Sequence, residues 1–230
     1  MLTKRTLALA AFALLSAAPA PAQKLPDLAP YLMSDRAAEI ALSRTAAPKH
    51  VADSAAVLVL TRTGYVSAAK GGNGFTCLVA RSFHARIGDP EFWNAKVRAP
   101  HCFNPGASRT VMLEYLKRAE WVLAGIPLAD ITKRTQNAYA SREFPLPAAG
   151  SMAFMLSPKQ YIVDKDPHWV PHLMFYYDRS IPSAAWGVGG DTPTIIDAAA
   201  DDPKNPVLTL LIPVRRWSDG TVAAKSAAGH

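Results

Sequence analysis

The sequence has few cysteines and none of the short motifs that mark common enzyme families. Its 230 residues include only two cysteines, and it has no C-x-x-C, no H-E-x-x-H and no G-x-S-x-G. A thioredoxin-like redox motif, a zincin protease motif and the nucleophile elbow of α/β-hydrolases are therefore excluded. No cofactor motif is present either, so we expect neither a cofactor nor a metal ion.

The sequence also lacks a basic stripe. The formal charge is +7, but lysines and arginines occur in ones and twos, as in Lys133-Arg134 and Arg215-Arg216. A nucleic-acid surface needs basic side chains gathered on one face. We therefore expect no nucleic-acid partner. A mild positive excess favours contact with an anionic component of a cell envelope.

Long apolar runs are missing except at the N-terminus. Lys4-Arg5 precedes an apolar run over 7–18, and Ala-Pro-Ala follows at 20–22. This is the three-part pattern of a secretory signal cleaved after Ala22. The run is shorter than the ~20 residues that cross a bilayer, so we expect no stable membrane insertion after cleavage. The pattern predicts a periplasmic or secreted protein.

The predicted organisation has three parts. Residues 1–22 are the signal peptide, residues 23–220 form one globular domain, and residues 221–230 are a small, polar-ended tail that we expect to be disordered. Removing the signal lowers the formal charge from +7 to +5. Half of the residues are hydrophobic, which is enough to build a core.

Cys77 and Cys102 have two possible roles. In an oxidising compartment a lone pair of cysteines forms a disulfide. The alternative makes Cys102 a thiolate nucleophile beside His101. Neighbouring residues on a strand point to opposite faces, so His101 is badly placed to take a proton from Cys102. We therefore predict a disulfide.

Hydrophobic periodicity predicts alternating groups of helices and strands. Runs at 56–62, 65–70 and 75–83 are separated by the turn sequences TG and GGNG, which predicts a three-stranded antiparallel meander with its first strand central or well covered. The region 84–103 has little periodicity and is expected to be irregular. The other predicted elements are helices over 35–46, 105–124 and 127–144, and strands over 151–157, 172–178 and 207–214.

This order of elements predicts an α+β domain. We expect a mostly antiparallel sheet with the helices packed on one face. The order is compatible with a profilin-like or PAS-like sandwich. That comparison rests on element order alone and implies no function.

The stretch DPHWVPHLMFYYD at 166–178 is the most suggestive of chemistry. His168 and His172 could share a metal ion on a helix, but Pro171 disfavours a helix there. Along a strand, residues four apart lie roughly 13 Å apart, too far for one ion to bind both. We therefore predict a strand with a hydrogen-bonded histidine near its start and no metal site.

Two other motif matches fail on their predicted surroundings. SAAK at 67–70 matches the S-x-x-K of penicillin-binding proteins, but on a strand its serine and lysine point to opposite faces. GGNG at 71–74 precedes a strand, whereas a phosphate loop leads into a helix. A hairpin turn is the better interpretation.

Loop tryptophans are the candidates for ligand binding. Trp169, Trp186 and Trp217 lie in or beside predicted loops, where they could line a sugar or aromatic pocket. The alternative is that they anchor the loops to a small core.

Three functional hypotheses follow. The first is an exported envelope protein that binds a small molecule or an envelope component without catalysis, because no complete catalytic set is present. The second is an exported hydrolase whose acid–base residues come from separate loops, with His101, His172 and either Asp178 or Asp219 as candidates. The third is a structural protein without a ligand.

Overall fold

The computed structural model describes residues 26–189, 194–200, 202 and 204–224. The predicted signal peptide over 1–22 lies outside these residues. Of the predicted tail, Thr221–Ala224 are described, and Val222 forms an isolated β-bridge with Arg216. In the described part of the chain, no helix is long and apolar enough to cross a membrane.

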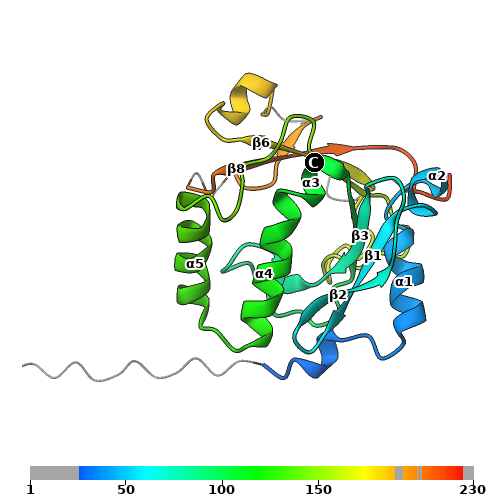
Figure 1. Ribbon diagram of the computed structural model, residues 1–230. Helices are drawn as coiled ribbons and strands as arrows, with labels where there is room; N and C mark the ends of the chain where they lie inside the picture. Colours follow the sequence, from blue (N-terminus) through cyan, green and yellow to red (C-terminus); the bar gives the residue numbers. More distant parts are fainter. Residues whose placement is uncertain (1–25, 190–193, 201, 203, 225–230) are drawn as a thin grey trace, which may run out of the picture.

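Eight strands of the described chain form one sheet in the order β2-β1-β3-β4-β5-β6-β8-β7 (Figure 1). Every neighbouring pair is antiparallel except β1 and β3. The fold is therefore α+β with a mostly antiparallel sheet, as predicted. The strands are β1 (Ala56–Thr61), β2 (Gly64–Ala69), β3 (Thr76–Ala80), β4 (Ala99–Phe103), β5 (Met152–Met155), β6 (His172–Asp178), β7 (Ile196–Asp197) and β8 (Val207–Pro213).

The first three strands do not form the predicted meander. β1 is central as expected, but β3 runs parallel to it on the side opposite β2. The GGNG segment causes this, because it passes the start of β1 instead of making a hairpin. A Cβ at Gly71 would lie 2.1 Å from the Ala56 nitrogen, and the amides of Gly72 and Asn73 donate to the Ser54 carbonyl. Only glycine allows so close a crossing.

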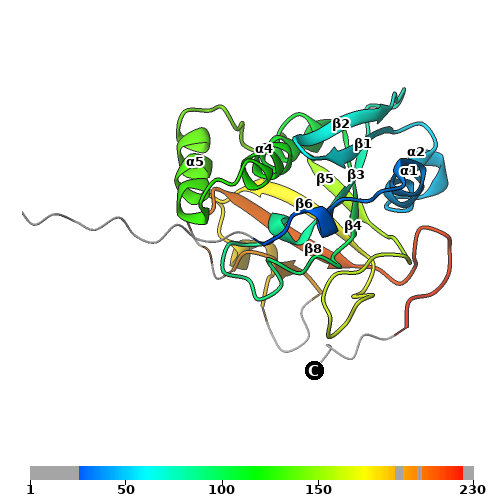
Figure 2. The same ribbon diagram turned by 90° about the horizontal axis from the view of Figure 1, so that it is seen from below.

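The helices lie on both faces of the sheet, which corrects the prediction of one covered face. The α1–α2 region packs on the face that carries Cys77, Cys102 and Phe154, whereas α4 packs on the face of Leu78 and Phe103 (Figure 2). Residues on both faces of β3 are buried, so each face must pack against other elements of the protein. The α-helices are α1 (Arg36–Arg44), α2 (Lys49–Ala52), α3 (Pro105–Ser108), α4 (Val111–Leu123) and α5 (Leu128–Ala140).

The predicted disulfide is present. Cys77 on β3 and Cys102 on β4 are directly opposite each other in the ladder, and their sulfurs are bonded. We had predicted an irregular connection over 84–103, and this was wrong for Cys102, which lies in the regular strand β4. His101 points to the opposite face, so the cysteine–histidine pair considered above does not form.

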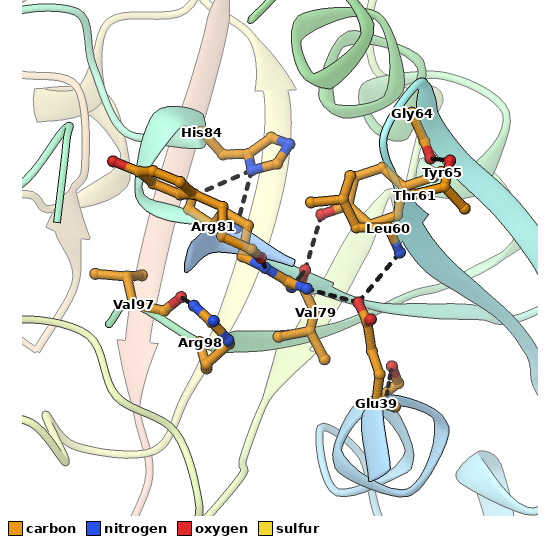
Figure 3. A network of polar contacts seen from close by, with 12 residues as sticks. Glu39, Leu60, Thr61, Gly64, Tyr65, Val79, Arg81, His84, Val97 and Arg98 are labelled. Carbon is orange, nitrogen blue, oxygen red and sulfur yellow. Dashed lines mark hydrogen bonds and ion pairs between the residues drawn. The ribbon is translucent and has the colours of Figure 1, made fainter. Parts of the chain in front are cut away.

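A buried ion pair fills the gap where β1 and β3 separate (Figure 3). The two strands pair only at their first residues. Beyond that point Glu39 of α1 accepts a hydrogen bond from the Leu60 amide (3.2 Å) and pairs with Arg81 (2.8 Å). The Arg81 side chain also donates to the Val79 and Tyr31 carbonyls. Side chains thus replace the missing backbone hydrogen bonds of the sheet.

Candidate functional site

A cavity of about 510 Å³ lies between the helices α4 and α5 and the strands β6 and β8. Figure 1 shows α4 and α5 side by side, with β6 and β8 crossing over them. The remaining wall comes from the loop after the short 3-10 helix η2 (Ser82–His84) and from the chain between β7 and β8. The lining is mixed: Val111, Tyr115, Met174, Tyr176 and Val207 supply apolar and aromatic surface, and Glu114, Arg118, Thr135 and Tyr139 supply polar groups.

The polar part of the cavity is built on one turn of α4. Glu114 and Arg118 are four residues apart and therefore lie on one face of the helix. Arg118 Nη2 contacts Glu114 Oε1 at 2.6 Å, and the Tyr139 hydroxyl of α5 donates to Glu114 Oε2 at 2.8 Å. Arg118 Nη1 also donates to the Ala85 carbonyl at 2.8 Å. The cluster joins both helices and the η2 loop around the cavity.

Two polar atoms in this wall lack a partner. Arg118 Nε and Thr135 Oγ1 are buried and make no hydrogen bond within the described part of the chain. A buried group left unpaired costs roughly 1–3 kcal/mol. The polar wall of the cavity is therefore incompletely satisfied by the protein itself.

The tyrosines of the cavity are neutral phenols at physiological pH. Burial raises the pKa of Tyr115 to about 12, and the Glu114 carboxylate contributes to the rise. Burial also raises the pKa of Tyr139 and of Tyr176 well above the usual range. These hydroxyls can donate and accept hydrogen bonds, but they are not set up to lose their protons.

His84 connects the cavity to the buried ion pair. Its Nδ1 accepts from the Arg81 amide (3.0 Å) and its Nε2 donates to the Tyr115 carbonyl (3.1 Å). Burial, together with the positive charge of Arg118, lowers the pKa of His84 to about 3. Both ring nitrogens of this neutral imidazole are hydrogen-bonded to the backbone, so the side chain has a structural role and no free nitrogen for proton transfer.

The predicted catalytic histidines share a sheet face but do not form a pair. His101 on β4 and His172 on β6 are buried, and β5 lies between their strands. Each Nδ1 donates to the carbonyl two residues earlier, at Ala99 (2.8 Å) and Val170 (2.9 Å). The rings therefore have the same orientation on strands that lie roughly 9–10 Å apart. Burial lowers the pKa of each to about 4.

The two candidate carboxylates lie elsewhere. Asp178 is exposed at the far end of β6 from His172 and accepts from the Ser180 amide. Asp219 is exposed in a turn, where hydrogen bonds from Thr221 lower its pKa. The structure does not bring these four residues together. Among the described residues no three His, Cys, Asp or Glu side chains could hold a metal ion.

The three candidate tryptophans also occupy separate places, and none lines the cavity. Trp169 contacts the His172 ring edge to face at 4.8 Å. Trp186 stacks on Tyr177 with ring centres 4.2 Å apart. Trp217 belongs to the turn that its backbone closes with Thr221.

Comparison with known proteins gives no relative: no family model, no curated protein and no solved structure matches the chain. The cavity must therefore be interpreted from its own chemistry. Sequence reasoning missed Glu114, Arg118 and Tyr139. The one available signal was the Glu–Arg spacing of four, which is also typical of a solvated helix face.

Proposed function

We propose that the protein binds a small organic molecule in the cavity between α4, α5, β6 and β8, without catalysing a reaction on it. The observation that carries the proposal is the pairing of a cavity of about 510 Å³ with an incompletely satisfied polar wall. Binding sites for small molecules are typically clefts of ~300–1,000 Å³ with mainly apolar walls and a few polar groups.

The lining favours a ligand with an apolar body and a hydrogen-bond acceptor. Met174, Tyr176 and Val207 offer apolar and aromatic contacts from the sheet side. On the helix side, Arg118 and Thr135 carry donors with no acceptor in the described chain. The charge of Arg118 is offset by Glu114 at 2.6 Å, so a ligand of low net charge fits better than a strongly anionic one.

The hydrolase alternative has less support. Its histidines are buried, neutral and on separate strands, and its carboxylates are exposed and apart from them. The phenols of the cavity keep their protons, since burial raises their pKa values. General acid–base catalysis requires a group whose pKa lies near the working pH. His84 and the three tyrosines of the cavity do not provide it, because burial moves their pKa values away from neutrality.

The proposed place of action is the periplasm or the medium. The Cys77–Cys102 disulfide fits a protein that works outside the cytoplasm, where disulfides form and persist. The finer assignment rests on the N-terminal pattern of residues 1–22.

Titration with N-phenyl-1-naphthylamine, an uncharged apolar fluorophore, tests the proposal. We expect saturable fluorescence enhancement in the wild type. Ala198 lines the cavity and is exposed, so Ala198→Trp should fill the mouth and weaken binding about tenfold or more, as loss of ~1.4 kcal/mol would. Ala148→Trp is the matched control, because Ala148 is exposed outside the lining. Equal binding by both variants would contradict the proposed site.

A further inference from the structure

The loop that follows β6 is apolar and exposed. Residues 180–189 read SIPSAAWGVG and contain no charged side chain, although 19% of the chain is charged. Ile181 is 49% exposed, and Pro182, Ala184 and Ala185 are exposed as well. In Figure 1 this loop, with the 3-10 helix η3 (Ser183–Trp186), projects from the top of the molecule, away from the helices α1, α4 and α5.

The loop is held in this exposed shape by contacts at its base. Trp186 stacks on Tyr177 of β6, with an angle of 27° between the rings. Arg179 donates to Asp197 (3.1 Å) and to the Asn205 carbonyl (2.8 Å), which ties the start of the loop to the chain around β7. Gly187 adopts a positive φ of 77°, which closes the short helix. These contacts fix the conformation of the loop, and Ile181 is exposed in that conformation.

We infer that this loop docks the protein on the surface of a lipid bilayer, with Ile181 and its apolar neighbours entering the headgroup region. The site is a convex tip without a groove, and a tip of ten residues is too small for the ~800 Å² that each partner buries in a stable protein complex. Ile and Trp side chains are favourable at the boundary of a membrane.

The net charge of the protein also favours a lipid bilayer as the surface that the loop contacts. Residues 23–230 carry a formal charge of +5, which attracts the protein to an anionic lipid surface at long range. Residues 180–189 carry no charge, so they can leave water without burying one, whereas the exposed Asp178 lies at the base of the loop. Long-range attraction and short-range apolar contact are the two components of binding by peripheral membrane proteins.

Docking would bring the cavity close to the membrane. Arg179, at the base of the loop, donates to the carbonyls of Asn205 and Val207, and both of these residues line the cavity. A lipid surface is one source of molecules with an apolar body and a hydrogen-bond acceptor. The docking inference itself stands on the loop alone and does not need the proposed ligand.

Vesicle co-sedimentation of residues 23–230 tests the inference. We expect the wild type to sediment with phosphatidylcholine vesicles that contain phosphatidylglycerol. Ile181→Asp should lower the partition coefficient about tenfold or more, because a charge replaces an apolar group at the interface. Val222→Asp is the matched control, since Val222 is 58% exposed outside the loop, and it should bind like the wild type.

Depth is measured by fluorescence quenching with brominated lipids. The wild type should be quenched by bromines near the headgroups. Trp186→Phe keeps an aromatic ring against Tyr177, and it should sediment with vesicles while losing most of this quenching. These results would support docking through the loop.

Four results would overturn the inference. The wild type could fail to sediment, or Ile181→Asp could bind as well as Val222→Asp. Binding that high salt abolishes in all variants alike would assign it to scattered basic residues. A wild-type dimer that Ile181→Asp dissociates in the absence of vesicles would show that a second copy of the chain covers the loop.

Discussion

The ion pair between β1 and β3 and the polar cluster of the cavity use the same residue types in different ways. In the first, Arg81 and Glu39 are fully buried, and Arg81 donates to Glu39 and to two backbone carbonyls (Figure 3). In the second, Arg118 and Glu114 keep some exposure, with 13% and 16% of their side chains accessible. The Arg118 Nε has no partner in the described chain.

The difference separates a structural cluster from a candidate binding site. The Arg81 cluster replaces backbone hydrogen bonds, and the Arg81 guanidinium donates to three acceptors, Glu39 and the carbonyls of Tyr31 and Val79. It therefore has nothing to offer a ligand. The Arg118 cluster borders a cavity and has unused donors. Buried polar groups are usually satisfied, so an exception needs an explanation. A ligand that supplies an acceptor is the explanation we favour.

Acidification should lower the free energy of unfolding more than any of the single substitutions below, because three buried histidines are neutral in the folded protein. Burial lowers the pKa of His84 to about 3 and those of His101 and His172 to about 4. In the unfolded chain a histidine has a pKa of ~6.5, so the unfolded state binds protons first. The stability held by these neutral rings is complete above about pH 6.5 and is lost as the pH falls toward 4. Each histidine contributes a slope of up to ~1.4 kcal/mol per pH unit.

Urea unfolding measured at several pH values between these limits checks this dependence. His172→Gln removes one titrating group while retaining a side chain that can donate to the Val170 carbonyl. The variant should show a shallower loss of stability with acid than the wild type. An equal slope in both proteins would contradict the assignment of a depressed pKa to His172.

Breaking the buried ion pair should cost more than breaking the pair at the cavity. Glu39→Leu leaves the Arg81 guanidinium buried without its carboxylate, and we expect a loss of ~3–5 kcal/mol in the free energy of unfolding. Glu114→Leu removes the acceptor of Arg118 and of the Tyr139 hydroxyl, but these groups keep some access to water, so its cost should be about 1–3 kcal/mol. Urea unfolding of the two variants gives the comparison directly. Equal losses in the free energy of unfolding would mean that the two ion pairs contribute equally to stability, which would contradict the distinction drawn between them.

Removal of the disulfide should cost less than loss of Glu39 and should not change the fold. Cys77 and Cys102 close a loop with a sequence separation of 25, and such a cross-link stabilises a protein by ~2–4 kcal/mol. The double variant Cys77→Ala, Cys102→Ala should unfold at lower urea concentration with an unchanged circular dichroism spectrum. Thiol titration of the denatured wild type should find no free thiol. A reactive thiol there would be inconsistent with the bond.

The smallest expected effect is at Thr135. Thr135→Val replaces a buried hydroxyl without a partner by a methyl group of similar shape. We expect a stability change within about 1 kcal/mol, in the stabilising direction. If the ligand accepts a hydrogen bond from this hydroxyl, the same change weakens its binding. A strongly destabilised variant would show that the hydroxyl has a partner inside the protein.

The sequence was sufficient for the elements with strong periodicity. β6 and β8, the helix α5 and the disulfide lie where alternation, turn residues and cysteine count place them. β4 was missed because Pro100 lies within it, and proline in a run argues against a central strand. The parallel pairing of β1 and β3 depends on the close crossing at Gly71, which no periodicity encodes.

The cavity could not be predicted for a different reason. Read along the chain, Glu114 and Arg118 resemble residues of a solvated helix surface, and Tyr139 resembles a core position of its helix. Their burial depends on how α4 and α5 pack against β6 and on where the segment after β7 returns. The candidates chosen from the sequence were histidines, tryptophans and two aspartates, which are residue types suited to catalysis or ligand binding. In the structure His101 and His172 are core residues of the sheet.

Native mass spectrometry of the protein purified from its expression host tests the central claim most directly. We predict that the wild type carries a small organic molecule that remains bound in Ala148→Trp and is absent from Ala198→Trp. Of these two alanines, Ala198 lines the cavity and Ala148 does not. A wild type that has no adduct and does not bind the naphthylamine probe would contradict the account. An adduct that persists in Ala198→Trp would place the ligand elsewhere and would contradict it equally.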